Sequence, residues 1–211
     1  MQIKSFVFSP FQENTYLIYD ENGQGIIVDP GCAEPHEKQA LKSFIEENNI
    51  QVQLLLQTHC HIDHIFGNAW VYQTYGLSAR MHQADLPWME NAEQAAARWG
   101  LQVEAPEIPQ DQFLEHGEII TLGQMKWEVR YTPGHAPGHV VFVNHEAGVI
   151  IAGDTLFRES IGRTDLPLCK HEDLIESIQK QLFSLPDHYR VLSGHGPETT
   201  IGHEKQFNPF L

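Results

Sequence analysis

Residues 58–64 of the chain read THCHIDH and directly follow the apolar run Leu54-Leu55-Leu56. An unbroken run of this kind is typical of a strand that is buried on both faces, so Val52–Gln57 is predicted to be a buried strand. Three imidazoles and a carboxylate cannot all point to one side of a strand, because alternate residues face opposite sides. The segment 58–64 is therefore predicted to form a turn just past the strand.

This turn contains four good ligands for a divalent metal: His59, His61, Asp63 and His64. His59 and His61 are two residues apart and are expected to share a face. Asp63 and His64 are expected to be carried by the turn toward a second position nearby. A solvated His-rich loop is the alternative interpretation of this segment taken alone.

Three further segments repeat the pattern of a β-rich run that ends in a glycine-containing turn with a ligand-type side chain. They are Thr132–His135, Ala152–Asp154 and Ser193–Gly196, and they contribute His135, Asp154 and His195. Glycine beside a ligand lets the backbone approach closely and adopt positive φ, as crowded metal loops require. Four strand ends with this pattern favour a metal site over a solvated loop.

Hydrophobic periodicity predicts the remaining elements. The predicted strands are Ile3–Ser9, Tyr16–Tyr19, Gly25–Asp29, Leu77–Met81, Ile119–Leu122, Lys126–Tyr131, Val140–Asn144, Val149–Ala152 and Tyr189–Leu192. The predicted helices are Glu34–Asn48, Gly67–Tyr75, Gln83–Trp99 and His171–Ser184, and Leu101–Gly117 is predicted to be a surface loop or flap. The order resembles one half repeated, which predicts two sheets with helices outside, in one domain over residues 1–211.

Charge and cysteine content limit the partners and the compartment. The chain has 13 Lys and Arg against 28 Asp and Glu, a net charge of -15, which repels polyanions and anionic membranes. Neither nucleic acid nor a membrane is therefore an expected partner. Cys32, Cys60 and Cys169 form no disulfide framework, and the N-terminus lacks the pattern of a signal peptide, so a cytoplasmic location is expected. The sequence specifies no oligomeric state.

These motifs resemble those of the metallo-β-lactamase fold hydrolases and, within them, the glyoxalase II (hydroxyacylglutathione hydrolase) branch. The resemblance covers most of the chain and implies an α/β (α+β) fold, a four-layer αββα sandwich. It also implies a ligand set, in which one metal is held by His59, His61 and His135, the other by Asp63, His64 and His195, and both by Asp154.

This ligand set suits two divalent metal ions, with zinc preferred and iron or manganese tolerated. Two cations about 3.5 to 4 Å apart can share a hydroxide whose pKa falls to about 7, so no serine or cysteine nucleophile is needed. The expected reaction is hydrolysis of a small-molecule thioester. Asp63 and Asp154 are the predicted catalytic carboxylates, and Asp63 would serve as a general base if one metal were absent.

Asp154 and Arg163 narrow the resemblance further. Zinc β-lactamases typically carry a cysteine or serine at the position of Asp154, whereas thioester hydrolases keep the aspartate. The segment GDTLFRESIGR, residues 153–163, resembles glyoxalase II, in which a lysine at the position of Arg163 binds the glutathione moiety. Arg163 is therefore predicted to bind substrate, because a guanidinium suits a carboxylate. A surface arginine paired with Asp165, which stands where the family has a tyrosine, is the alternative.

Other reaction classes stay open. The GRTD segment and the C-terminal GHGPETTIGHEKQFNPFL resemble compact, single-domain glyoxalase II-like hydrolases. Persulfide dioxygenases share HxHxDH and GRTD but use one iron, which His59, His135 and Asp154 would hold here. The loop at His195 favours two metals and hydrolysis. Hydrolysis of another ester, amide or phosphoester and a non-enzymatic metal-binding protein are further alternatives, and a nuclease is disfavoured by the charge.

Cys60 and the remaining histidines are assigned no role in the chemistry. Cys60 lies between two ligands on an extended segment, so its side chain should point away from the metals and be buried. His139 and His145 are expected to be structural.

Overall fold

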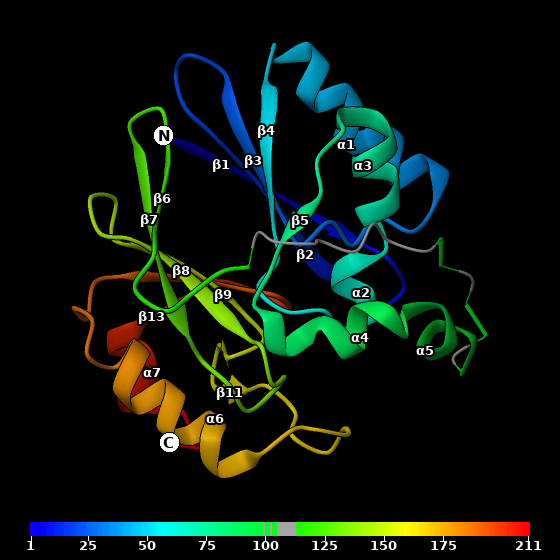
Figure 1. Cartoon of the computed structure of the whole chain (residues 1–211). Helices are drawn as coiled ribbons and strands as arrows, with labels where there is room; N and C mark the ends of the chain where they lie inside the picture. The colour runs from blue at the N-terminus through cyan, green and yellow to red at the C-terminus, as the bar shows by residue number, and fades with distance from the viewer. Residues whose placement is uncertain (99, 102, 105–112) are drawn as a thin grey trace.

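Two β-sheets face each other in the computed structural model, which describes residues 1–98, 100–101, 103–104 and 113–211 (Figure 1). The first sheet has the order β1-β2-β3-β4-β5. Its strands are β1 (Gln2–Phe8), β2 (Glu13–Tyr19), β3 (Gln24–Val28), β4 (Gln51–Leu56) and β5 (Ala79–Arg80). The strands β1 to β3 are antiparallel, and β4 and β5 continue the sheet in parallel with β3.

The second sheet has the order β13-β12-β9-β8-β7-β6. Its strands are β6 (Ile119–Leu122), β7 (Met125–Tyr131), β8 (Val140–Asn144), β9 (Val149–Gly153), β12 (Arg190–Ser193) and β13 (Thr199–Thr200). Only the β9–β12 pair of this sheet is parallel. A small hairpin, β10 (Leu156–Phe157) and β11 (Ser160–Ile161), follows β9.

Apolar side chains fill the space between the sheets and the space outside each sheet. Trp127, Phe142 and Ile151 of the second sheet pack between the sheets against Ile26 and Leu56 of the first. All five are almost fully buried, so this layer supplies a large share of the hydrophobic stabilisation.

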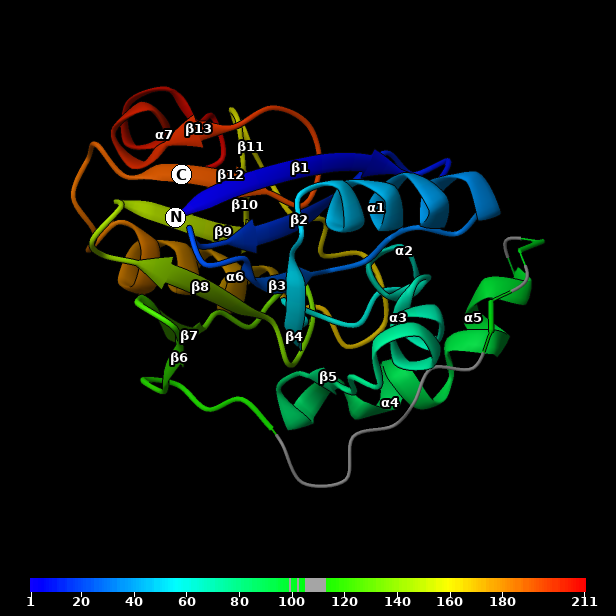
Figure 2. The same cartoon turned by 90° about the horizontal axis from the view of Figure 1, so that it is seen from above.

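Helices cover the outer face of each sheet. Leu41 and Ile45 of α1 (Pro35–Glu47) and Val71 of α3 (Asn68–Tyr75) pack on the first sheet. Leu174 of α6 (His171–Ser177) packs on the second, together with residues of η2 (Ile178–Leu182) and α7 (Ile201–Phe207). Figure 2 shows α1 and α3 on the right of the strands and α7 on the left. The predicted four-layer αββα sandwich is confirmed.

Parallel pairing places the ends of neighbouring strands at one edge of each sheet. Val28 pairs with Leu56 in the first sheet, so the residues after β3 and after β4 leave the sheet side by side. Gly153 pairs with Ser193 in the second sheet, so the residues after β9 and after β12 do the same. This register brings together segments that are far apart in the chain.

The prediction of one continuous helix over Gln83–Trp99 is wrong. The described part of that segment is divided into η1 (Gln83–Asp85), α4 (Leu86–Glu90) and α5 (Ala92–Arg98), and residue 99 lies outside the described residues. Pro87 lacks a backbone N–H and belongs in a first helical turn, so a helix begins anew at Leu86. The side chain of Asn91 donates to the carbonyl of Pro87 and ends α4.

Other differences concern short elements. The predicted helix His171–Ser184 ends in the π-helical turn η2, and the strand after Pro10 begins at Glu13 rather than at Tyr16. The short helix α2 (Ile62–Ile65), the hairpin β10–β11, β13 and α7 were not predicted. Most of the predicted loop Leu101–Gly117, namely residues 102 and 105–112, lies outside the described residues. Throughout the described ranges, the helices are too short or too polar to cross a membrane.

Candidate metal centre

The seven predicted ligands meet at one edge of the sandwich. His59 and His61 lie in the loop after β4, and Asp63 and His64 lie on α2, which follows at once. His135 comes after β7, Asp154 after β9 and His195 after β12. Both sheets therefore contribute donors, as the pattern of strand ends predicts.

Three imidazole nitrogens form a first cluster. Nε2 of His135 lies 2.8 Å from Nδ1 of His61 and 3.2 Å from Nε2 of His59. All three side chains are buried. Their ligand atoms lie close enough together to hold one metal ion.

Asp63, His64 and His195 form a second cluster. Oδ2 of Asp63 lies 3.2 Å from Nε2 of His195 and 3.9 Å from Nε2 of His64. These ligand atoms also lie close enough together to hold one ion.

The carboxylate of Asp154 lies between the two clusters. Its Oδ1 is 3.4 Å from Nε2 of His64, and its Oδ2 is 3.4 Å from Nε2 of His135 and 3.6 Å from Nε2 of His195. One side chain thus faces donors of both clusters. This arrangement is the one that a bridging ligand of a two-metal centre requires.

Unpartnered polar atoms test whether these residues fit metal ions. Nε2 of His64 and Oδ1 of Asp154 are within ion-pair range of each other, yet both are buried and neither makes a hydrogen bond within the described part of the chain. Buried polar atoms without a partner are costly, and a cation between them would remove that cost. Gly194 maintains this space, because a Cβ there would collide with Oδ1 of Asp154. A donor set of imidazole nitrogens and carboxylate oxygens fits zinc or a similar divalent ion.

In four of these histidines, the ring nitrogen Nδ1 lies within hydrogen-bond distance of an oxygen atom. Nδ1 of His59 lies 3.1 Å from the Thr58 hydroxyl, and Nδ1 of His64 lies 3.1 Å from Asp29. Nδ1 of His135 lies 2.8 Å from the carbonyl of Arg163, and Nδ1 of His195 lies 3.1 Å from that of Phe11. Each ring is thereby oriented with Nε2 toward the clusters, and metal-binding histidines are commonly held in this way.

Burial and the neighbouring charges set the protonation states. Burial lowers the pKa of His59, His61 and His135, in the case of His61 to about 3, and the neighbouring histidines lower the pKa of His59 and His61 further. These three imidazoles are therefore neutral, the state that binds a metal. Burial opposes the ionisation of Asp63, but His64 and His195 outweigh it and lower the pKa of that carboxyl.

Two buried carboxylates that the sequence analysis missed support the centre from outside. Asp29 follows β3 and accepts hydrogen bonds from the backbone N–H and the hydroxyl of Thr58 at 2.7 and 2.5 Å. Asp85 accepts from the backbone N–H groups of Cys60 and Gly138. Asp29 has a sequence signal, since it follows an apolar strand as the ligands do. Asp85 has none, because its partners are remote in the chain.

Cys60 and His139, to which the sequence analysis assigns no role in the chemistry, are both buried. Cys60 is buried with its sulfur 3.5 Å from that of Met81, so the prediction that its side chain is buried is confirmed. His139 is buried, and its Nε2 accepts from the backbone N–H of Asp154 at 3.0 Å. This contact gives His139 a structural role next to the centre.

Arg163 lies at the rim of the centre. Its side chain pairs with Asp165, which is the alternative that the sequence analysis left open. It is exposed and forms two hydrogen bonds to Asp165, at 2.7 and 2.8 Å. Its side chain also lines the cavity above the clusters. Any anion that bound Arg163 would compete with Asp165.

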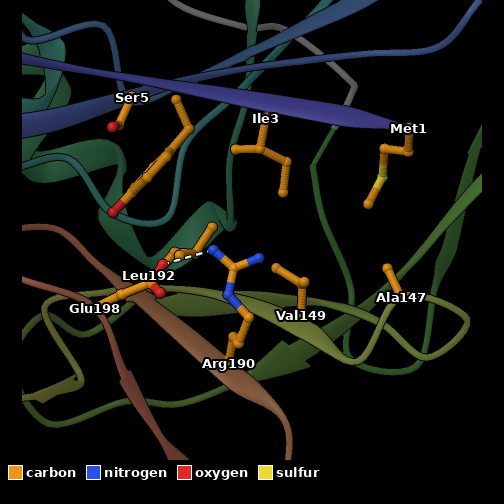
Figure 3. Close-up of a pocket in the computed structure, with 9 residues that line it drawn as sticks. Met1, Ile3, Ser5, Ala147, Val149, Arg190, Leu192 and Glu198 are labelled. Atoms are coloured by element: carbon orange, nitrogen blue, oxygen red, sulfur yellow. Dashed lines mark hydrogen bonds and ion pairs between the residues drawn. The ribbon is translucent and has the colours of Figure 1, made fainter.

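A cavity of about 830 Å³ opens above the two clusters. His61, Asp63, His135, Asp154 and His195 contribute to its floor. A second cavity, of about 240 Å³, lies between the sheets at Met1, Val149 and Leu192 (Figure 3). Its charged groups are Arg190 and Glu198, which pair with each other at 2.6 Å. The donors suited to metal chemistry therefore lie under the larger cavity.

Comparison with known proteins agrees with this geometry. The sequence pattern of the Metallo-beta-lactamase superfamily matches residues 8–195. Hydroxyacylglutathione hydrolase GloC of Haemophilus influenzae is 38% identical over 212 residues, which cover 100% of this chain and 98% of that protein. The chain therefore belongs to the metallo-beta-lactamase superfamily and is a metal-dependent hydrolase.

Solved structures resemble the whole chain. The crystal structure of the BLEG-1 B3 metallo-beta-lactamase superposes with a TM-score of 0.91 at 34% identity, covering 100% of this chain and 99% of that one. The structure of TTHA1623 in a di-iron-bound form superposes with a TM-score of 0.89 at 38% identity, covering 99% of this chain and 100% of that one.

Proposed function

We propose that the protein hydrolyses a small thioester of the S-acyl glutathione type at two divalent cations, with zinc as the preferred metal. In this proposal His59, His61 and His135 would hold one cation, Asp63, His64 and His195 would hold the other, and Asp154 would serve both. The observation that carries the proposal is the position of Asp154, whose two oxygens face the two clusters at 3.4 Å each. A single-iron centre held by His59, His135 and Asp154 would leave the second cluster without a metal ion to bind.

The reaction forms a bond between a water oxygen and the carbonyl carbon and breaks the carbon–sulfur bond. When bound, the two cations supply a water molecule of lowered pKa and polarise the carbonyl. Asp63 lines the cavity and is ionised, so with one cation absent its carboxylate can accept the proton that the water loses. With both cations bound Asp63 would be a ligand, and that proton passes to the solvent in the open cavity. The thiolate leaves with the electron pair of the broken bond and becomes a thiol when it takes up a proton.

The relatives support hydrolysis and suggest what to compare. GloC carries the name hydroxyacylglutathione hydrolase and matches this chain from end to end. BLEG-1 carries the name of a β-lactamase, which makes β-lactam hydrolysis the second candidate activity. Asp154, at the position where zinc β-lactamases typically carry cysteine or serine, favours the thioester. TTHA1623 was solved with two irons, so iron is the metal to test against zinc.

Metal analysis combined with parallel assays tests the proposal. The purified protein is analysed for metals by mass spectrometry and assayed with S-lactoylglutathione, with a cephalosporin and with glutathione persulfide in an oxygen electrode. We expect two metal ions per chain and thioester cleavage without oxygen uptake. One iron per chain with oxygen consumption on the persulfide would contradict it, as would cleavage of the cephalosporin alone.

A further inference from the structure

The cavity above the clusters has apolar walls on both sides of its floor. The ring centroid of Trp88 lies 4.7 Å from that of His61, and the ring centroid of Phe157 lies 6.2 Å from that of His195. Further apolar side chains complete the walls: Phe11, Ile62, Pro87, Ile161, Leu166, Pro167 and Leu168. A group bound close to the floor therefore meets aromatic and aliphatic side chains first.

Outside the floor, most polar side chains of the cavity are exposed, and Ser160 is half-buried. Asn91, Gln94 and Arg98 line it from α5 and the residue before it, and all three are exposed to solvent. Arg163 lines it from the other side, and Asp165 already compensates its charge. Charged groups of a substrate are therefore best placed at the solvent side of the cavity, away from the floor.

We propose that the acyl half of the substrate is a bulky apolar group, larger than acetyl or lactoyl. This inference rests on the proposed thioesterase function and names its substrate class. The acyl substituent is bonded directly to the carbonyl carbon that must lie at the floor, so it is held within reach of Trp88 and Phe157. The thiol sulfur is bonded to the same carbon, but the charged groups of a carrier such as glutathione lie several bonds farther away and can reach the exposed polar side chains.

The size of the cavity agrees with this substrate class. Its volume of about 830 Å³ lies in the range of cavities that enclose a complete small-molecule ligand. A lactoyl group would leave most of the apolar wall in contact with water. An acyl group with several more methylenes, or with a phenyl ring, would displace that water and gain the hydrophobic free energy of the contact.

A series of thioesters with one thiol isolates the acyl preference. The substrates are the S-lactoyl, S-acetyl, S-butanoyl, S-hexanoyl and S-phenylacetyl derivatives of glutathione, assayed with the metal-loaded enzyme. We expect kcat/KM to rise about 4-fold per added methylene until the wall is covered, the fold-change that corresponds to about 0.8 kcal/mol per buried methylene. S-phenylacetylglutathione should be cleaved faster than the S-lactoyl compound.

Alanine variants at two exposed residues test whether the apolar wall of the cavity causes the acyl preference. Leu168 is 59% exposed and lines the cavity, whereas Ile119 is 55% exposed and lies on β6, away from it. Neither substitution by alanine removes a core contact, so both variants should fold. Leu168→Ala should reduce the ratio of hexanoyl to lactoyl cleavage several-fold, and Trp88→Ala should reduce it further. Ile119→Ala should leave the ratio unchanged.

The outcomes separate this inference from the function on which it rests. A kcat/KM that stays flat or falls with acyl size, with lactoyl cleavage intact, would overturn the apolar acyl class and leave the thioesterase function in place. An increase that Ile119→Ala abolishes as strongly as Leu168→Ala would also overturn it. If no thioester in the series is cleaved, both the proposed function and the substrate class that rests on it are wrong.

Discussion

The carboxylate of Asp29 lies 3.1 Å from Nδ1 of His64, and both side chains are buried. A ring whose Nδ1 donates a hydrogen bond to a carboxylate presents the lone pair of Nε2 once that nitrogen has lost its proton. Nε2 of His64 faces Asp63 and Asp154. Asp29 therefore selects the tautomer of His64 that can bind a metal in the second cluster.

Replacing Asp29 by asparagine should weaken metal binding. The amide has nearly the size of the carboxylate but lacks its charge, so Nε2 of His64 becomes a weaker ligand for a metal ion. We expect Asp29→Asn to lower the affinity for the second metal by about 10- to 100-fold, the usual effect of removing such an outer partner. Competition with a chromophoric chelator measures this affinity.

The matched control is Asp20→Asn. Asp20 is also a buried carboxylate, but it accepts from the backbone N–H groups of Asn22 and Gln24 in a turn of the first sheet. Its replacement should leave metal affinity unchanged. Equal affinity in wild type and Asp29→Asn would show that Asp29 does not act through His64.

Removal of His195 should abolish the second metal site. His195 is partly exposed, and its Nε2 lies 3.2 Å from Asp63, so truncation removes a ligand without opening a cavity in the core. We expect His195→Ala to hold one metal instead of two and to lose on the order of 100-fold in thioester turnover. Metal content and kcat are the measurements. A variant that keeps both metals and full turnover would rule out the assignment of two metals to these ligands.

The convergence of the candidate ligands could be predicted from the sequence because a local pattern marks each of them. His135, Asp154 and His195 each follow a β-rich run and lie beside a glycine, and each of these runs forms a strand of the second sheet. Parallel pairing of β3 with β4 and of β9 with β12, and the shared direction of β7 and β9 on either side of β8, then place these strand ends at one edge. The order of strands and helices was sufficient to predict the sandwich, because these elements are also marked by local patterns.

The supporting contacts could not be predicted, because they depend on pairs that are distant in the chain. Asp85 lies 25 residues from Cys60 and 53 residues from Gly138, and nothing in the segment around it distinguishes a buried carboxylate from a solvated one. The break between α4 and α5 has a local cause in Pro87 and Asn91 that hydrophobic periodicity does not detect. The ion pair of Arg163 with Asp165 was foreseen only as an alternative.

Arg163 and Asp165 make a paired prediction about substrate charge. Arg163→Ala should raise KM for a thioester with an anionic thiol more than it lowers kcat, because the contact is made in the bound substrate and in the transition state alike. Asp165→Asn should lower that KM several-fold, since it frees the guanidinium. Steady-state kinetics with S-lactoylglutathione tests both variants. Unchanged KM in both would remove Arg163 from substrate binding.

The three cysteines should differ in reactivity. Cys32 and Cys60 are fully buried, and burial raises the pKa of Cys32 to about 12 and that of Cys60 well above its ordinary value. Cys169 is only partly buried and donates to the carbonyl of His135 at 2.7 Å. Because the thiolate is the reactive form, a disulfide reagent near pH 8 should modify Cys169 alone in the folded protein and all three in denaturant. Rapid modification of Cys60 in the folded protein would contradict its burial.

Asp85 should make the stability of the protein depend on pH. Its Oδ2 accepts from the N–H of Cys60 at 2.9 Å and its Oδ1 from that of Gly138 at 2.5 Å, so it joins the loop of His59 and His61 to the loop of His135. Burial raises the pKa of Asp85 from 3.8 to about 6, although these two N–H groups oppose the shift. The folded state therefore binds the proton of Asp85 more tightly than the unfolded state does.

The sign of the effect follows from linkage. The contribution of this protonation to stability is complete below the unfolded pKa of 3.8 and is lost as the pH rises through about 6. Asp85→Asn cannot ionise and lacks this dependence. The free energy of unfolding of the wild type minus that of Asp85→Asn should therefore fall by about 2 kcal/mol between about pH 4 and pH 7. Urea denaturation of the metal-free proteins measures it, and a difference that is constant or rises with pH would show that burial does not hold the proton on Asp85.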